Sequence, residues 1–248
     1  MFTATTNEVT GVINEQYNKV EYYFHYKQVN ESLSKATERM YNKLKEDFEM
    51  PDTSSKLMVD SIAVDSLEQY RKYRYFSAKV VANSVVGQNN FIVLNRGTAQ
   101  DLKEGMGIIE PNSGVVGIIT EVSNNFAVVM SLLHKDSHIS GKLMHRGETG
   151  TMSWDGKTPN ILTLAGIPQS AKVTKGDTII TSGFSTSFPK GMLIGYVDEV
   201  IAEKSTNNYT IKLRSAANFY NLEFVYAIDN KQTEEINKLL DKVKKQIQ

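Results

Sequence analysis

Apolar positions in the first fifty residues recur at helical spacing. From about Asn7 to Phe48 the chain contains no proline and one glycine, Gly11, while glutamate, lysine and apolar residues alternate with a helical period. Pro51 follows, and the residue before a proline is disfavoured in the α conformation. The pattern therefore predicts one long helix within residues 1–50.

One side of this predicted helix carries a seam of mostly apolar residues. They are separated by alternating steps of four and three, the a and d alternation of a coiled coil. The members are Tyr22, Tyr26, Val29, Leu33, Ala36 and Met40. A helix of ~40 residues spans roughly 60 Å, which is longer than a small domain is wide. We expect a coiled coil that associates with a second copy, and the alternative is a helix lying on its own globular domain.

After a linker at residues 51–72, the pattern changes to short β-branched and aromatic runs. Residues 78–86, 91–94 and 115–122 are examples, and they are bounded by Gly, Asn, Asp and Ser. Such runs are typical of strands rather than helices. The region is predicted to be all-β.

A duplication divides this β region into two halves. Its pairs, with the earlier copy first, are residues 91–94 and 161–164, 105–109 and 176–180, 117–122 and 195–200, and 128–132 and 211–215, with 139–143 and 224–228 as a weaker match. Each half then has about six strands in ~75 residues, the size of a small closed barrel. Closure also removes exposed strand edges. We predict a first six-stranded β-barrel at 73–146 and a second at 147–229.

The last residues, 230–248, have the pattern of a short amphipathic helix. Thr233 is a possible N-cap, and Glu234 and Glu235 would lie in the first turn, where acidic side chains are favoured. The fold expected from the whole sequence is mainly β. It consists of a long N-terminal coiled-coil helix, two tandem small barrels and a short C-terminal helix.

Charge and cysteine content exclude several classes of partner. Lysine plus arginine and aspartate plus glutamate both total 28, so the formal net charge is zero. No overall field attracts the chain to nucleic acid, and we expect no nucleic-acid partner. The absence of cysteine excludes disulfides and thiolate chemistry.

Candidate catalytic and metal-binding residues do not form a recognisable set. His134 and His138 are four residues apart in a stretch predicted as a strand end and turn, with no third ligand at zinc-type spacing. Ser113 and Ser182 precede glycines but lack the local context of a serine nucleophile. We therefore expect no metal, no cofactor and no enzymatic activity.

One stretch, residues 183–197, resembles the most distinctive segment of the MreC family of rod shape-determining proteins. The shared pattern is Thr-Ser-Gly, then Phe-Pro-x-Gly, then Ile-Gly-x-Val, and weaker matches cover about residues 79–228 in family order. The motif positions that we expect to be structural are Gly117, Gly183, Phe188, Pro189, Gly191 and Gly195.

This resemblance implies a fold, a location and a set of partners. It implies a short cytoplasmic tail and one transmembrane helix, followed by a coiled-coil helix and two β-barrels outside the cytoplasmic membrane. Neither tail nor membrane helix is recognisable here, so we expect the anchor to belong to a longer protein. The family links the actin-like MreB, the membrane protein MreD, the glycosyltransferase RodA and a class B penicillin-binding transpeptidase.

The expected function is therefore that of a non-catalytic scaffold for peptidoglycan synthesis on the periplasmic side of the membrane, acting as a homodimer or a higher assembly. A periplasmic adaptor of an efflux or secretion pump is the alternative, because such adaptors also join a coiled coil to small β-domains. Adaptors usually carry a helical hairpin inserted into a lipoyl-like domain. This sequence predicts one N-terminal helix without a return.

Overall fold

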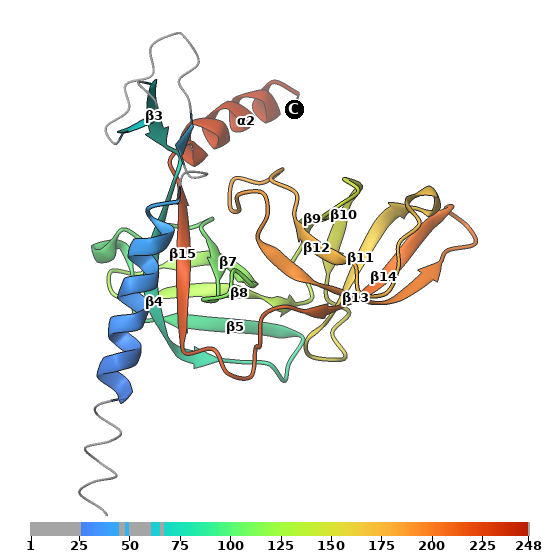
Figure 1. Cartoon of the computed structure of the whole chain (residues 1–248), viewed down its shortest axis with the longest axis horizontal. Coiled ribbons are helices and arrows are strands. Elements are labelled where there is room, and N and C mark those ends of the chain that lie inside the picture. Colours follow the sequence, from blue (N-terminus) through green and yellow to red (C-terminus); the bar gives the residue numbers. More distant parts are fainter. Residues whose placement is uncertain (1–25, 45–47, 50–60, 65–66, 248) are drawn as a thin grey trace, which may run out of the picture.

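The computed structural model describes residues 26–44, 48–49, 61–64 and 67–247, and the account below concerns those residues. Two β-barrels lie next to each other, an N-terminal helix at residues 26–41 packs against the first of them, and a C-terminal helix projects from one end (Figure 1). A small sheet is formed by β1 (Phe48–Glu49), β3 (Leu67–Arg71) and β2 (Ser61–Val64), in that order. It lies at the same end of the molecule as the C-terminal helix (Figure 1).

Both predicted barrels are present, and each has six strands in a closed ring. The first contains, in spatial order, β15 (Phe224–Asn230), β4 (Tyr73–Asn83), β5 (Asn89–Leu94), β8 (Ala127–His134), β7 (Val115–Val122) and β6 (Gly107–Ile109). The second contains β10 (Thr149–Ser153), β11 (Ile161–Pro168), β14 (Asn208–Ser215), β13 (Leu193–Ala202), β12 (Thr178–Thr181) and β9 (Ile139–Leu143). Short 3-10 helices lie at Thr98–Gln100 and Gln169–Ala171.

The barrel interiors are filled by side chains at alternate strand positions. Ile92 and Leu94 of β5 are fully buried in the first barrel, and Leu162 and Leu164 of β11 are fully buried in the second. This alternation follows from the two-residue period of a strand, which sends successive side chains to opposite faces. The buried residues of both barrels belong to one connected cluster, so the barrels share a continuous core.

The two barrels exchange their last strands. β9 directly follows β8 along the chain, yet it pairs with β10 and β12 of the second barrel. β15 directly follows β14, yet it pairs with β4 and β6 of the first barrel. The predicted contiguous division into 73–146 and 147–229 therefore differs from the strand membership of the barrels. A local pattern fixes that a segment is a strand, but it does not fix which neighbour the strand pairs with.

The duplication is visible in the strand register. Gly117 pairs with Ser131 and Gly195 pairs with Ser215, and a register shift follows both glycines at the same distance. These pairs make Ser131 equivalent to Ser215. The sequence alignment of 128–132 with 211–215 was therefore wrong by one residue.

The N-terminal helix ends earlier than predicted. It stops at Tyr41 rather than near Phe48, which is in strand β1, and the part before residue 26 lies outside the described residues. The helix unwinds through hydrogen bonds from the N–H of Lys43 to the Met40 carbonyl and from the N–H of Leu44 to the Tyr41 carbonyl. The next residue, Asn42, forms hydrogen bonds with Tyr75 of β4, and the helix does not continue past it.

The predicted linker at 51–72 contains strands in its described part, because β2 and β3 pair with each other there. The hinge expected near residues 50–56 lies outside the described residues. No helix in the described ranges is both long and apolar enough to cross a membrane.

The C-terminal helix α2 (Thr233–Ile247) has the predicted extent, with Glu234 and Glu235 in its first turn. The predicted N-cap is wrong, however. Thr233 is the first helical residue, and its hydroxyl donates to the carbonyl oxygen of Thr186 at 3.3 Å.

Candidate interaction site

The N-terminal helix packs against the first barrel where one strand lacks a neighbour. β4 pairs with β15 along most of its length, but its pairing with β5 begins only at Val80. The earlier part of β4 would otherwise present unpaired backbone groups, which are costly to leave unsatisfied in a buried setting. The N-terminal helix, drawn in blue, lies alongside this part of β4 (Figure 1).

Polar side chains from the helix and the turn after it satisfy this free edge. Asn42 Oδ1 accepts the N–H of Tyr75 at 2.9 Å, and Asn42 Nδ2 donates to the Tyr75 carbonyl at 2.9 Å. Glu38 Oε2 accepts the N–H of Ser77 at 3.1 Å and its hydroxyl at 2.5 Å. The side chains thus take the role of a missing neighbouring strand.

Tyr41 anchors the end of the helix in the barrel. Its side chain is 9% exposed, and its ring stacks on Tyr75 with a centroid separation of 5.0 Å. Its hydroxyl lies 3.0 Å from the carbonyl oxygen of Pro111 and 2.9 Å from Ser113 Oγ. Burial raises the pKa of the Tyr41 hydroxyl, so this group stays protonated and can donate. Tyr226 adds a hydrogen bond from its hydroxyl to the helix carbonyl of Ser34, at 3.2 Å.

The predicted seam faces away from this interface. The exposed fractions are 49% for Tyr26, 38% for Val29, 59% for Leu33 and 70% for Met40, and Ala36 is also exposed. At roughly 100° per residue, the centre of the seam lies about 130° around the helix from the centre of Ser34, Glu38 and Tyr41. Tyr22 lies outside the described residues.

Of the two alternatives for the helix, the structure supports the one in which it lies on its own domain, and the coiled coil stays a prediction. The helix does lie on its own domain, but through a polar face that the sequence analysis did not single out. The available signal was the spacing of Ser34, Glu38, Tyr41 and Asn42, which places these residues on one side of a helix. The apolar seam is left uncovered by the described part of the chain.

The loop between β12 and β13 carries the matched motif and joins the barrels. Phe188 is 1% exposed, and it packs so closely on Gly107 of β6 that a Cβ added to that glycine would lie 2.4 Å from the ring. Thr181 Oγ1 donates to the Pro189 carbonyl at 2.6 Å. Gly183 and Gly191 have φ values of 84° and 103°, which favour glycine.

Gly117 and Gly195 occupy equivalent places in the two barrels. A Cβ at Gly117 would lie 2.2 Å from the carbonyl oxygen of Met130, and a Cβ at Gly195 would lie 2.3 Å from that of Arg214. Both positions need the absence of a side chain, because two strands approach closely there. The six motif positions thus lie at turns and close contacts rather than around a reactive group.

Two of the residues considered as catalytic candidates, His134 and Ser182, make structural contacts. His134 is 5% exposed, its Nδ1 accepts the N–H of Asp136 at 3.1 Å, and its ring packs edge-on against Phe91. Ser182 Oγ lies 2.8 Å from Ser140 Oγ. Within the part of the chain that the structure describes, no three metal-ligating side chains come together.

Comparison with known proteins gives a consistent family match. A family model described as "Rod shape-determining protein MreC, barrel core" matches residues 80–229. The cell shape-determining protein MreC of Listeria monocytogenes is 25% identical over 166 residues, covering 66% of this chain and 56% of the relative. The chain therefore spans little more than half the length of that relative.

Solved structures of such proteins share the fold. A structure of MreC from Listeria monocytogenes superposes with a TM-score of 0.59 at 21% identity, covering 87% of this chain and 94% of the other. A structure of the major periplasmic domain of the cell shape-determining filament MreC has a TM-score of 0.54 at 20% identity, and the match covers 64% of this chain and 98% of the other. A chain in a complex between the penicillin-binding protein PBP2 and MreC from Helicobacter pylori has a TM-score of 0.51 at 20% identity, and the match covers 64% of this chain and 99% of the other.

Proposed function

The chain belongs to the MreC family of rod shape-determining proteins, and on that premise we propose that it is a non-catalytic scaffold for peptidoglycan synthesis. In this proposal the N-terminal seam joins two copies, and the two barrels present a binding surface to a peptidoglycan synthase. The scaffold would act by binding one conformation of the synthase more tightly than another, since only differential affinity shifts such an equilibrium.

The observation that carries this proposal is the exposure of the seam. Large apolar side chains at coiled-coil spacing are more stable when they are buried against a partner helix than when they are exposed to water. Leu33 and Met40 are more than half exposed, while the opposite face of the same helix is fixed to the barrel by Glu38 and Asn42. A second copy of the helix offers the matching apolar surface.

The proposed partner is a class B penicillin-binding transpeptidase. Support comes from the complex of PBP2 with the Helicobacter pylori protein, whose fold this chain shares. We extend the proposal to the glycosyltransferase RodA and to MreD, with MreB contacted through a cytoplasmic tail of the longer protein. These partners follow from the family resemblance.

The proposed location is the periplasmic side of the cytoplasmic membrane, with an N-terminal transmembrane anchor in the longer protein. The similar fold of a periplasmic domain supports this location. The pump-adaptor alternative gains no support from the matches described above. We also propose that the protein has no catalytic role, in keeping with the shape-determining description of its family.

Binding of the extracytoplasmic part of the class B transpeptidase from the same organism tests the proposal. Isothermal titration calorimetry should give saturable binding to the whole chain, and the double variant Leu33→Lys, Met40→Lys should bind more weakly if dimerisation contributes to the surface. The variant Gln28→Lys, Ser32→Lys adds the same charge at exposed positions of the same helix outside the seam, and it should bind as the wild type does. Absence of saturable binding to the wild-type chain would contradict the proposed partner.

A further inference from the structure

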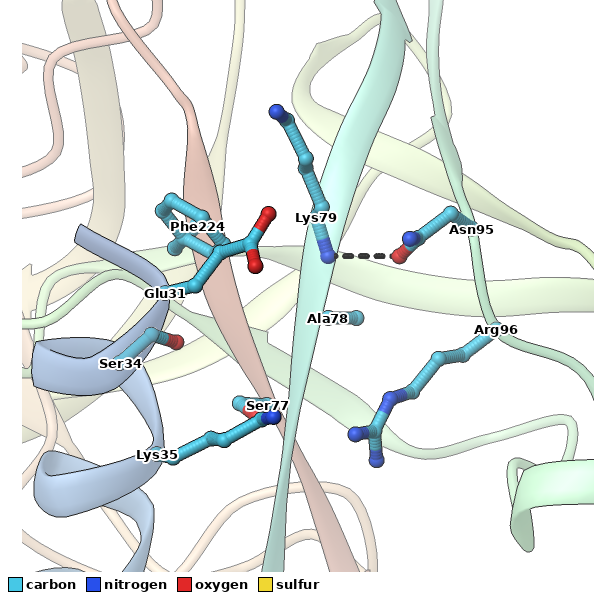
Figure 2. A pocket seen from close by; sticks show the side chains of 9 residues that line it. All are labelled: Glu31, Ser34, Lys35, Ser77, Ala78, Lys79, Asn95, Arg96 and Phe224. Atoms are coloured by element: carbon cyan, nitrogen blue, oxygen red, sulfur yellow. Dashed lines mark hydrogen bonds between the residues drawn. The ribbon is translucent and has the colours of Figure 1, made fainter. Parts of the chain in front are cut away.

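A hollow of about 220 Å³ lies at the junction between the N-terminal helix and the first barrel. Its walls come from the helix, from β4, from the loop after β5 and from the start of β15 (Figure 2). One water molecule needs only ~10–15 Å³ of such space. The hollow can therefore hold a small ligand group rather than solvent alone.

Positive charge predominates around this hollow. Lys35 from the helix, Lys79 from β4 and Arg96 from the loop after β5 line it, and Glu31 is the acidic residue of the lining. Glu38 is outside the lining, and its carboxylate accepts two hydrogen bonds from Ser77 and keeps its negative charge. The side chains that line the hollow thus carry a formal excess of two positive charges.

Two of these cations have no counter-ion in the part of the chain that the structure describes. Among the described residues, neither Lys35 nor Arg96 forms an ion pair or a side-chain hydrogen bond, and Arg96 is only partly exposed. Lys79 lies with its Nζ 5.7 Å from the centre of the Phe224 ring. A partly buried guanidinium has five N–H donors, and leaving them unsatisfied is unfavourable.

A buried hydroxyl next to these cations also lacks a partner. Ser34 is 6% exposed, and its Oγ makes no hydrogen bond within the described structure. Figure 2 shows this oxygen on the side of the helix that faces β4 and the hollow. An unsatisfied buried hydroxyl is unfavourable by itself, and a ligand that accepts its hydrogen would remove the penalty.

The walls are held in place by hydrogen bonds that leave the cations free. Asn95 Oδ1 accepts the N–H of Lys79 at 2.8 Å (Figure 2), and the Asn95 N–H donates to the Lys79 carbonyl at 3.0 Å. The next-but-one residue, Gly97, is fixed by its N–H bond to Gln100 at 2.9 Å. The backbone that carries Arg96 is therefore anchored on both sides.

We propose that this hollow is a binding site for an oxyanion, the carboxylate or phosphate group of a small molecule or of a partner. The Arg96 guanidinium can bind two oxygens of such a group at once, and Lys35 and the Ser34 hydroxyl can donate from the opposite wall. The ligand then bridges the helix and the barrel. Occupancy stabilises the docked position of the helix, which also sets the direction of the exposed seam.

Titration of the whole chain with sodium phosphate and, separately, with sodium citrate tests this site. Ionic strength is kept constant with sodium chloride, and binding is followed by calorimetry and by the amide NMR signals of Ser34, Ser77 and Arg96. Saturable binding of one equivalent is expected. The variant Lys35→Gln, Arg96→Gln should weaken it at least about tenfold, because two charge-assisted contacts are lost.

Two further variants separate a specific site from general attraction. Ser34→Ala should weaken anion binding about threefold to tenfold, yet it should not lower the thermal midpoint without anion, because the hydroxyl has no partner there. Lys135→Gln, Lys204→Gln removes the same charge from exposed positions outside the hollow and should bind as the wild type does.

Binding of phosphate only, citrate only or both supports the site and identifies its ligand group. Failure of both anions to saturate the wild-type chain at millimolar concentration overturns the proposal. Equal weakening by the hollow variant and the exposed control variant also overturns it, because it indicates unspecific attraction.

Discussion

Asn42 forms two hydrogen bonds with the backbone of one residue, Tyr75. Its Oδ1 accepts the Tyr75 N–H, its Nδ2 donates to the Tyr75 carbonyl oxygen, and both distances are 2.9 Å. This is the pattern by which a neighbouring strand would pair with β4. Arg71 holds Asn42 in turn, with a 2.7 Å bond from Nη1 to the Asn42 carbonyl. The residue that ends the helix thus closes a free strand edge, which explains why the helix stops where it does.

Replacing Asn42 tests this explanation. Asn42→Ala removes both hydrogen bonds to the partly buried backbone of Tyr75, so the free energy of unfolding should fall by about 2 kcal/mol. Urea denaturation followed by circular dichroism measures this change. Gln28→Ala, an exposed position on the same helix, is the control and should have little effect. An equal effect of the two substitutions would contradict the edge-closing role.

The strand exchange predicts that neither half of the β region folds independently. A fragment of residues 73–146 contains β9 but lacks β15, and a fragment of 147–230 contains β15 but lacks β9. Each fragment alone should show no cooperative thermal transition, because its barrel is open and the borrowed strand has no partner. An equimolar mixture should recover structure by complementation. A cooperative transition in either fragment by itself would show that the exchange is dispensable.

The contact between Gly107 and Phe188 predicts that position 107 in β6 does not tolerate a side chain. Gly107→Ala places a methyl group 2.4 Å from both the Phe188 ring and the Ser187 carbonyl oxygen, so the free energy of unfolding should fall by about 1–3 kcal/mol through overpacking. Gly87→Ala is the matched control, because a Cβ there meets its nearest neighbour at 3.8 Å and its φ is not positive. Adding Phe188→Leu should recover part of the loss at residue 107. A purely additive double variant would contradict a role for the Phe188 ring and assign the loss to the Ser187 carbonyl oxygen.

Glu110 gives a prediction about pH. Burial raises the pKa of its carboxyl group, and a hydrogen bond from the backbone of Asn218 opposes that shift without cancelling it. The folded state therefore binds this proton more tightly than the unfolded state. The stability contributed by protonated Glu110 is present below the unfolded pKa and is lost as the pH rises through the higher folded value.

Glu110→Gln removes this dependence. Relative to the wild type, the variant should gain in thermal midpoint as the pH rises from below 4.5, the ordinary pKa, toward neutrality. Below that pH the two proteins should behave alike. Parallel curves of midpoint against pH for the two proteins would rule out a contribution from Glu110.

Much of the architecture follows from local sequence patterns. Period-two runs and the internal duplication were sufficient to predict two six-stranded barrels, and the amphipathic pattern from Thr233 onward was sufficient for α2. The end of the N-terminal helix was not predictable in this way, because Asn42 stops it through a contact with Tyr75, a residue distant in sequence. The exchange of β9 and β15 is likewise decided by pairing between distant strands.

Of the two candidate sites, one could be predicted from a local sequence pattern and the other could not. The seam lies on one helix, so its spacing in the sequence was enough to find it. The oxyanion site combines Ser34, Arg96 and Phe224, which come from distant segments of the chain. None of them stands out in a local pattern, and only the folded structure brings them together.

Sedimentation equilibrium of the whole chain is the most direct test of the central claim, that the exposed seam joins two copies. The wild type should have the mass of a dimer, and Leu33→Lys, Met40→Lys should have the mass of a monomer, because unpaired charges are unfavourable in an apolar seam. The control Gln28→Lys, Ser32→Lys should remain dimeric. A wild type that is monomeric at the highest concentration reached, or a seam variant that remains dimeric, would contradict the claim.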